Sequence, residues 1–316
     1  MRSIGFAVSG IKHYENSYYK NRSSSFAALS VTGIRCECRC AHCDASLLHS
    51  MADADTNEKI ISLADKLADS GCTGILISGG SGPDGSVPLM SVAEGIGYAK
   101  RRGLKVLVHS GLVDQNTAYA LKSADVDQVL PDVIGSEKTI RSVYGINKTP
   151  EDYFNSMLCC KNAGLKIAPH LVIGLDFGKI EGEYRAIDLV SQVEAENLVL
   201  VVLVPKRGTK MADTVPPPLA EVTDVFRYAS DVLKKCRITL GCSRPRVYSE
   251  ELEKAAVDLG FASIAYPHEE TIRYAEMLGY KTVFFEECCS IAGHEPGEDV
   301  CLNPATAGLP VHSPGG

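Results

Sequence analysis

Short apolar segments alternate with longer amphipathic segments along most of the chain. Segments rich in β-branched residues predict strands at residues 28–32, 73–78, 105–109, 126–133, 166–173, 197–204, 237–241 and 262–265. Stretches with apolar residues at helical spacing follow them and predict helices at residues 58–70, 90–101, 117–124, 149–163, 184–193, 219–235, 249–259 and 269–278. This succession of strand–helix units predicts an α/β fold, namely a parallel (β/α)8 TIM-type barrel.

The same pattern divides the chain into three parts. Residues 1–27 are expected to form an N-terminal extension, residues 28–285 the barrel, and residues 286–316 a C-terminal cysteine-bearing tail. The polar, proline-rich residues 206–219 predict a long loop after the sixth strand, either a lid or a plain connection.

Composition and charge narrow the class of protein. The chain has 316 residues, 45% of them hydrophobic and 22% charged, which is ordinary for a globular protein. The formal net charge is −7 and the Lys and Arg residues are scattered, so we expect no nucleic-acid partner. No apolar window reaches the length of a membrane span and no signal sequence is recognisable, so we expect a cytoplasmic protein without a membrane partner.

Twelve cysteines need an explanation in such a protein. In a reducing compartment, metal or cluster ligation is a better explanation than a disulfide framework. Cys36, Cys40 and Cys43 have the spacing C-x3-C-x2-C on the loop after the first predicted strand. Three thiolates on one short loop can hold a [4Fe–4S] cluster and leave one iron open, which the amino and carboxylate groups of S-adenosylmethionine can chelate.

This motif resembles that of the radical S-adenosylmethionine (SAM) superfamily, which also places it after the first barrel strand. The resemblance implies that His42, just before the third cysteine, packs near the adenine of SAM. A zinc site is the alternative, but zinc sites prefer paired C-x2-C elements and no second pair is obvious. Cys38 is either a bystander or a competitor for the ligand register.

The resemblance also suggests further SAM-binding residues at the ends of the predicted strands. Gly79 and Gly80 follow the second strand, where the family uses a Gly-Gly pair for the methionyl amino group, and Ser81 stands where an acidic residue is usual. Asp132, after the fourth strand, is a candidate for the ribose hydroxyls or else a helix cap. Ile173, in the fifth strand, corresponds to a segment that contacts adenine.

A second group of cysteines lies in the last third of the chain. Its members follow the seventh strand or belong to the tail, and we expect them to converge at the barrel mouth as candidate ligands of an auxiliary [4Fe–4S] cluster: Cys242, Cys288, Cys289 and Cys301. Such a cluster, facing the SAM radical across the substrate, suits sulfur insertion. The remaining cysteines are interpreted as core residues: Cys72, Cys159, Cys160 and Cys236.

The chain as a whole resembles the biotin synthase-like branch of the superfamily. The segments SGGS-x-x-DG-x-VPL, PHLVIGLDFGKIEGEY and LGCSRPR, with the tail cysteine pair, resemble most closely a subunit of the two-component lipoyl synthase. That resemblance implies sulfur insertion into an octanoyl chain on a lysine of a lipoyl-carrier protein or H protein, with a sister radical SAM subunit and an electron donor such as ferredoxin or flavodoxin.

Two other interpretations remain open at this point. One is biotin synthase or another enzyme of that branch, such as a methylase or a cofactor maturase; biotin synthase uses barrel cysteines and an arginine for its auxiliary cluster, and Arg244 lies near the corresponding strand end. The other is a non-enzymatic iron–sulfur protein.

Overall fold

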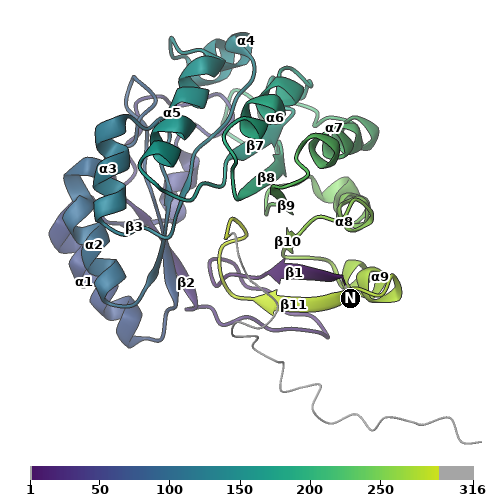
Figure 1. The fold of residues 1–316 in the computed structure, drawn as a ribbon, viewed down its shortest axis with the longest axis horizontal. Helices are drawn as coiled ribbons and strands as arrows, with labels where there is room; N and C mark the ends of the chain where they lie inside the picture. The colour runs from purple at the N-terminus through teal and green to yellow at the C-terminus, as the bar shows by residue number, and fades with distance from the viewer. Residues whose placement is uncertain (1, 292–316) are drawn as a thin grey trace, which may run out of the picture.

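The computed structural model of the protein describes residues 2–291 (Figure 1). The strands are β1 Ser3–Ala7, β2 Phe26–Ser30, β3 Ala52–Asp53, β4 Gly74–Ser78, β5 Lys105–His109, β6 Gln128–Leu130, β7 His170–Ile173, β8 Asn197–Val202, β9 Arg237–Leu240, β10 Ser263–Ala265 and β11 Lys281–Phe285. The α-helices are α1 Asn57–Asp69, α2 Ala93–Arg101, α3 Gln115–Ser123, α4 Glu137–Thr139, α5 Pro150–Asn162, α6 Glu183–Ser191, α7 Leu219–Val232, α8 Ser249–Asp258 and α9 Glu269–Met277.

The strands form two sheets in which every named pair is parallel. One sheet has the order β11-β1-β10-β9-β8-β7 and the other the order β3-β2-β4-β5-β6. Isolated parallel bridges, Val129 with Ile167 and Asp132 with His170, connect the sheets between β6 and β7. The helices lie on the outside of this curved arrangement (Figure 1).

The predicted α/β class with parallel strands is confirmed, and each predicted strand and helix has a counterpart. The structure differs at the start of the chain, where residues expected as an extension contribute β1, paired with both β10 and β11. Ile4 and Phe6 alternate with smaller residues and are fully buried, which fits a strand packed on one face. Across residues 2–291, no strand pairing joins β11 to β2, so the sheets form an open rather than a closed barrel.

Alternating strand residues build two apolar layers. Residues on the outer face pack against the helices, as Ile77, Val108 and Ile173 do. Residues on the inner face, such as Leu107 and Val199, line the barrel interior. This alternation decides which side chains can reach a site inside the barrel.

The chain turns into the barrel interior after β11. Glu286 holds this turn, since its carboxylate accepts hydrogen bonds from Arg22 Nε at 2.8 Å and Tyr19 Oη at 3.2 Å. Cys288, Cys289 and Ile291 then pack against inner-face residues of β2, β5, β6 and β8. Cys288 and Cys289 therefore lie inside the barrel, not only at its mouth as the sequence suggested.

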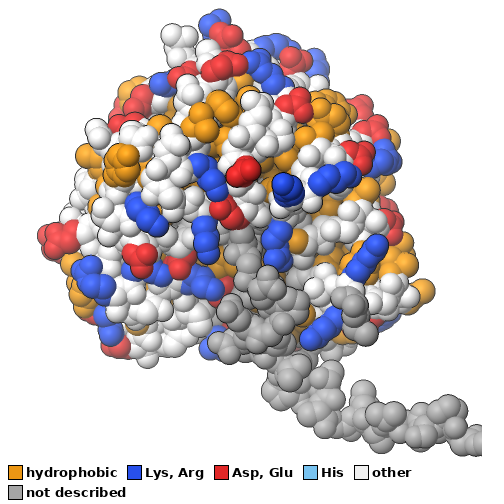
Figure 2. All heavy atoms as spheres, in the orientation of Figure 1, with side chains coloured by type: hydrophobic (Ala, Val, Ile, Leu, Met, Phe, Trp, Pro, Cys, Tyr) orange, Lys and Arg blue, Asp and Glu red, His pale blue; other side chains and the backbone are white. Residues whose placement is uncertain are grey.

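Two surface properties of the described residues bear on possible partners. None of their helices is both long and apolar enough to span a bilayer. Figure 2 shows basic and acidic side chains interspersed on the face in view, without a continuous basic area.

Candidate active site

The loop after β2 folds so that three potential metal ligands meet. Sγ of Cys40, an imidazole nitrogen of His42 and Sγ of Cys43 lie within 4.8 Å of one another. The Cys43 amide donates to Cys40 O at 3.2 Å, which closes a tight turn, and the Ala41 amide donates to Val143 O at 2.7 Å, which anchors it. The turn thus directs two thiols and one imidazole to a single point.

The electrostatics of this group favour a thiolate. A hydrogen bond from the Cys40 thiol, helped by His42, lowers the pKa of Cys43 to about 4. Hydrogen bonds with Cys38 and then with Cys43, together with burial, raise the pKa of Cys40. Because the thiolate is the form that binds metal, the site has one ligand ready and a second that metal binding must deprotonate.

The other cysteines of the loop face the segment after β4. Cys36 Sγ lies 3.9 Å from Ser81 O, outside the group of close ligand atoms. Cys38 Sγ donates to Gly82 O at 3.0 Å, and its thiol is also hydrogen bonded to Cys40. The structure therefore brings Cys40 and Cys43 together and places Cys36 on the same loop, at its edge.

Gly80 and Ser81 contact the cysteine loop through their backbone, whereas Gly79 packs against Val31, Thr32 and Val87. A Cβ on Gly80 would lie 2.0 Å from Arg35 O and 2.5 Å from Cys36 Cβ, so only glycine fits there. Ser81 O accepts from the amide of Glu37 at 2.9 Å and that of Cys38 at 3.3 Å. The Gly-Gly segment thus supports the loop that carries the candidate ligands, a role that the sequence alone did not indicate.

His42 extends this site toward the barrel interior. Its Nδ1 is buried without a hydrogen-bond partner among the described residues, and its ring meets that of Tyr144 at 5.6 Å between centroids. Tyr144 ends a π-helical turn, Ile140–Tyr144, a feature frequent at functional sites. Burial raises the pKa of Tyr144, and the nearby Asp132 and Cys40 add to this effect.

A line of polar side chains continues from Asp132 across the interior. Asp132 Oδ1 lies 3.7 Å from His109 Nε2, and the His109 and His170 rings meet edge-on at 5.1 Å. His170 Nδ1 lies 3.1 Å from Ala168 O, which can only accept, so Nδ1 carries the proton. Burial, and then His109, lower the pKa of His170 to about 3, which keeps its imidazole neutral.

The tail completes this line. Ser290 Oγ lies 3.2 Å from His170 Nε2 and 3.4 Å from Cys288 Sγ. Ser290 O accepts from Asn197 Nδ2 at 3.2 Å, which fixes the tail to the first residue of β8. The tail is therefore hydrogen bonded to two strands inside the barrel.

The candidate auxiliary ligands lie next to one another where they are described. A hydrogen bond from Cys289 lowers the pKa of Cys288 to about 7, and Cys242 lies close enough to affect the pKa of Cys289. Cys242 itself is exposed. Cys301 lies outside the described residues.

Side chains alternate between the two faces of β7, and the side chain of Ile173 lies on the face turned away from the barrel interior. Its side chain packs between β7 and the helices, and its carbonyl accepts from the Leu203 amide at 2.9 Å. The inward residues are His170 and Val172, and Val172 packs near Cys38 and Tyr144. Sequence analysis overlooked His170 and Val172, although the period of two along the strand would have separated them from Ile173.

Arg244 is occupied by structural contacts. Its buried guanidinium pairs with Glu253 at 2.5 Å and donates to Gly241 O at 2.9 Å. It also donates to the carbonyls of Ala265 at 2.8 Å and Tyr266 at 3.0 Å. Arg244 therefore joins the ends of β9 and β10 and does not face the tail cysteines as a free cation.

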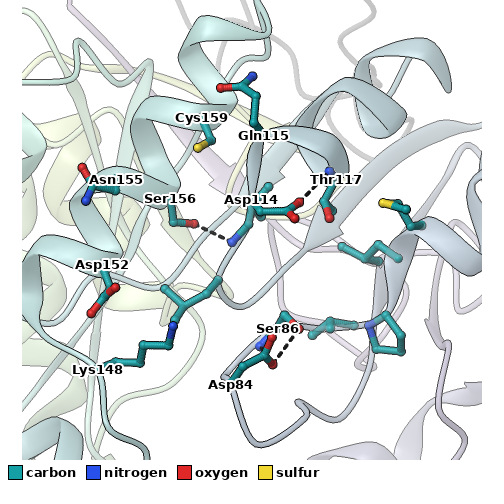
Figure 3. A pocket seen from close by; sticks show the side chains of 16 residues that line it. Asp84, Ser86, Asp114, Gln115, Thr117, Lys148, Asp152, Asn155, Ser156 and Cys159 are labelled. Atoms are coloured by element: carbon teal, nitrogen blue, oxygen red, sulfur yellow. Dashed lines mark hydrogen bonds between the residues drawn. The ribbon is translucent and has the colours of Figure 1, made fainter.

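A groove of about 390 Å³ is lined by the segments after β4 and β5 and by α3 and α5 (Figure 3). Asp84, Asp114 and Lys148 are among its lining residues, and Ser86 donates to Asp84 Oδ1 at 2.7 Å. The groove contains neither the cysteine loop nor the tail, so it is separate from the candidate active site.

Comparison with known proteins decides the family. The profile of the radical SAM superfamily matches residues 30–187, half of the chain, including the cysteine loop and the Gly-Gly segment. The chain belongs to the radical SAM superfamily. Membership implies SAM and a [4Fe–4S] cluster as cofactors.

Curated relatives of this radical SAM protein include the biotin synthases of Brucella canis and Brucella suis. Each is 25% identical over 169 residues, which is 52% of this chain and 50% of the relative. The chain therefore spans about half the length of the curated relatives it matches.

Solved structures share the fold. Methylornithine synthase (PylB) has a TM-score of 0.57 at 14% identity, covering 89% of this chain and 84% of its own. HydG, a maturase of the [FeFe]-hydrogenase, has a TM-score of 0.59 at 12% identity, covering 89% of this chain and 64% of its own.

The residues of the radical SAM loop fit a cluster and its nucleotide. Cys40 and Cys43 supply converging sulfur atoms, and the buried Nδ1 of His42 lacks a partner among the described residues. Cys36, the third thiolate of the motif, lies against the Gly80 backbone. These three cysteines would hold the cluster.

Proposed function

We propose that this radical SAM enzyme inserts sulfur into an octanoyl chain on a carrier-protein lysine, as one subunit of a two-component lipoyl synthase. One observation carries the proposal: Cys288 and Cys289 enter the barrel interior and connect through Ser290 to His170, in line with Asp132 and the cysteine loop. A second group of thiols inside the same barrel would suit a sulfur donor that acts beside a radical source.

Sulfur insertion needs two clusters with different functions. When bound, a SAM-loaded cluster supplies a radical that removes hydrogen from carbon, and an auxiliary cluster supplies sulfur. Cys36, Cys40 and Cys43 would hold the first cluster, whereas the tail cysteines with Cys242 would hold the second. The apolar inner face, with Leu107 and Val199, would exclude water from the space around the two clusters.

We propose that the two sheets work as one TIM-type barrel, with the tail covering the side between β11 and β2. A sister radical SAM subunit, an octanoylated lipoyl-carrier or H protein, and ferredoxin or flavodoxin would be its partners in the cytoplasm.

Biotin synthase is the second candidate, because the curated relatives favour it. The resemblance to biotin synthase implies that an arginine binds the auxiliary cluster, and in this chain Arg244 would have to supply it. The Arg244 guanidinium instead pairs with Glu253 and donates hydrogen bonds to three backbone carbonyls. This arrangement favours a sulfur-donor site built on the tail instead.

The test is anaerobic reconstitution followed by assay with an octanoylated carrier peptide, with and without the sister subunit. We expect 5′-deoxyadenosine together with a peptide in which sulfur replaces hydrogen. Dethiobiotin serves as the competing substrate. Conversion of dethiobiotin but not of the octanoyl peptide would replace our proposal with the biotin synthase interpretation.

A further inference from the structure

We propose that His170, through Nε2, is the nitrogen ligand of the second metal–sulfur centre, which it holds together with the thiolates of Cys242, Cys288 and Cys289. This inference rests on the proposed function in assuming a second cluster. It adds a ligand from β7 that the cysteine pattern does not contain.

The orientation of the imidazole supports the assignment. Metal-binding histidines commonly donate their second ring nitrogen to a backbone carbonyl, which fixes the tautomer and the ring plane. His170 has this arrangement, with Nδ1 3.1 Å from Ala168 O. The lone pair of Nε2 consequently points into the interior, toward the tail.

Nε2 approaches the tail cysteines through one serine hydroxyl. Its contact is Ser290 Oγ at 3.2 Å, and Ser290 Oγ is 3.4 Å from Cys288 Sγ. The Cys288 and Cys289 thiols are hydrogen bonded to each other, and Cys242 is close to Cys289. The Ser290 hydroxyl thus bridges Nε2 and Cys288 Sγ, so both atoms face the same space.

The chemistry of the set points to an iron–sulfur cluster. Three thiolates and one imidazole complete four-ligand coordination, and imidazole is an established replacement for cysteine in such clusters. Imidazole ligation raises the reduction potential relative to thiolate ligation.

His109 is a natural control, since it lies beside His170 without facing the tail. Its ring meets His170 edge-on at 5.1 Å, and its Nε2 is directed to Asp132 at 3.7 Å. Replacing His109 perturbs the same interior but removes no proposed ligand.

The experiment isolates the second centre in the full-length chain. Cys36, Cys40 and Cys43 are replaced by alanine, the protein is labelled with [15N]histidine, and it is reconstituted anaerobically with iron and sulfide. Iron content is measured, and the dithionite-reduced cluster is examined by pulsed EPR for coupling to a histidine nitrogen.

We expect roughly four irons per chain and a strong 15N coupling, which His109→Ala retains. His170→Ala should lose most of the iron. His170→Cys, which replaces nitrogen by sulfur, should keep the iron, lose the coupling and shift the reduction potential downward. This conservative variant keeps the test valid even if His170→Ala folds poorly.

Each other outcome contradicts the inference in a distinguishable way. A cluster without 15N coupling, or a coupling that persists in His170→Cys, removes His170 from the ligand set and leaves sulfur insertion intact. Zinc in place of iron, or no metal at all, overturns both the second cluster and this inference.

Discussion

The hydroxyl of Ser290 and Nε2 of His170 are 3.2 Å apart inside the barrel, although 120 positions separate them in the chain. This contact joins the C-terminal tail to β7. It places the neighbouring thiols of Cys288 and Cys289 in the barrel interior.

Removal of a central loop thiol should stop SAM cleavage. We expect Cys40→Ala to abolish 5′-deoxyadenosine formation, because Cys40 and Cys43 converge on one point and the cluster would lose a ligand. The measurement is nucleoside release by liquid chromatography. Cys159→Ala, on α5, is the control and should retain activity; formation of deoxyadenosine by Cys40→Ala would remove Cys40 from the ligand set.

Loss of Cys242 should separate the two chemical steps. We expect Cys242→Ala to cleave SAM but to transfer no sulfur, since Cys242 adjoins the tail thiols and not the cysteine loop. Deoxyadenosine and thiolated peptide are quantified in the same reaction. Cys236→Ala, at the other end of β9, should leave both products unchanged. Normal sulfur transfer by Cys242→Ala would refute its role in an auxiliary cluster.

A methyl group at Gly80 should displace the backbone of the cysteine loop at Arg35 and Cys36. The added Cβ would lie 2.0 Å from Arg35 O, a backbone atom that cannot move freely, so we expect Gly80→Ala to cost about 1–3 kcal/mol of stability and to impair iron loading. Gly82→Ala is the matched control, because its Cβ would approach nothing nearer than 3.4 Å. Denaturant unfolding and iron content measure the two effects; equal behaviour of both variants would contradict the support role of Gly80.

The contact between His268 and Glu253 should make stability depend on pH. The hydrogen bond to Glu253 raises the pKa of His268 above its usual range. A raised folded-state pKa stabilises the fold below the unfolded value of about 6.5, and this contribution disappears as the pH rises through the folded-state pKa. The loss of unfolding free energy in His268→Asn should therefore be larger near pH 6 than at about pH 9. A loss that is independent of pH would show that the contact does not involve the protonated imidazole.

The sequence predicted the elements well and the interior less well, for physical reasons. Apolar runs such as Asn197–Val202 identify a buried strand locally, and the cysteine spacing at Cys36–Cys43 identifies the loop chemistry. Local patterns do not show that Ser3–Ala7 pairs with Ser263–Ala265, because that pairing depends on residues more than 250 positions apart. The same applies to the tail, whose entry into the barrel depends on the Glu286 contacts with the segment before β2.

Iron and sulfide content after anaerobic reconstitution, together with Mössbauer spectra, tests most directly whether the chain has two cluster sites. We predict roughly eight irons per chain in the intact protein and roughly four in the variant lacking Cys36, Cys40 and Cys43, with a [4Fe–4S] spectrum in each. About four irons in the intact protein and none in that variant would contradict the account, because the tail cysteines would then hold no cluster.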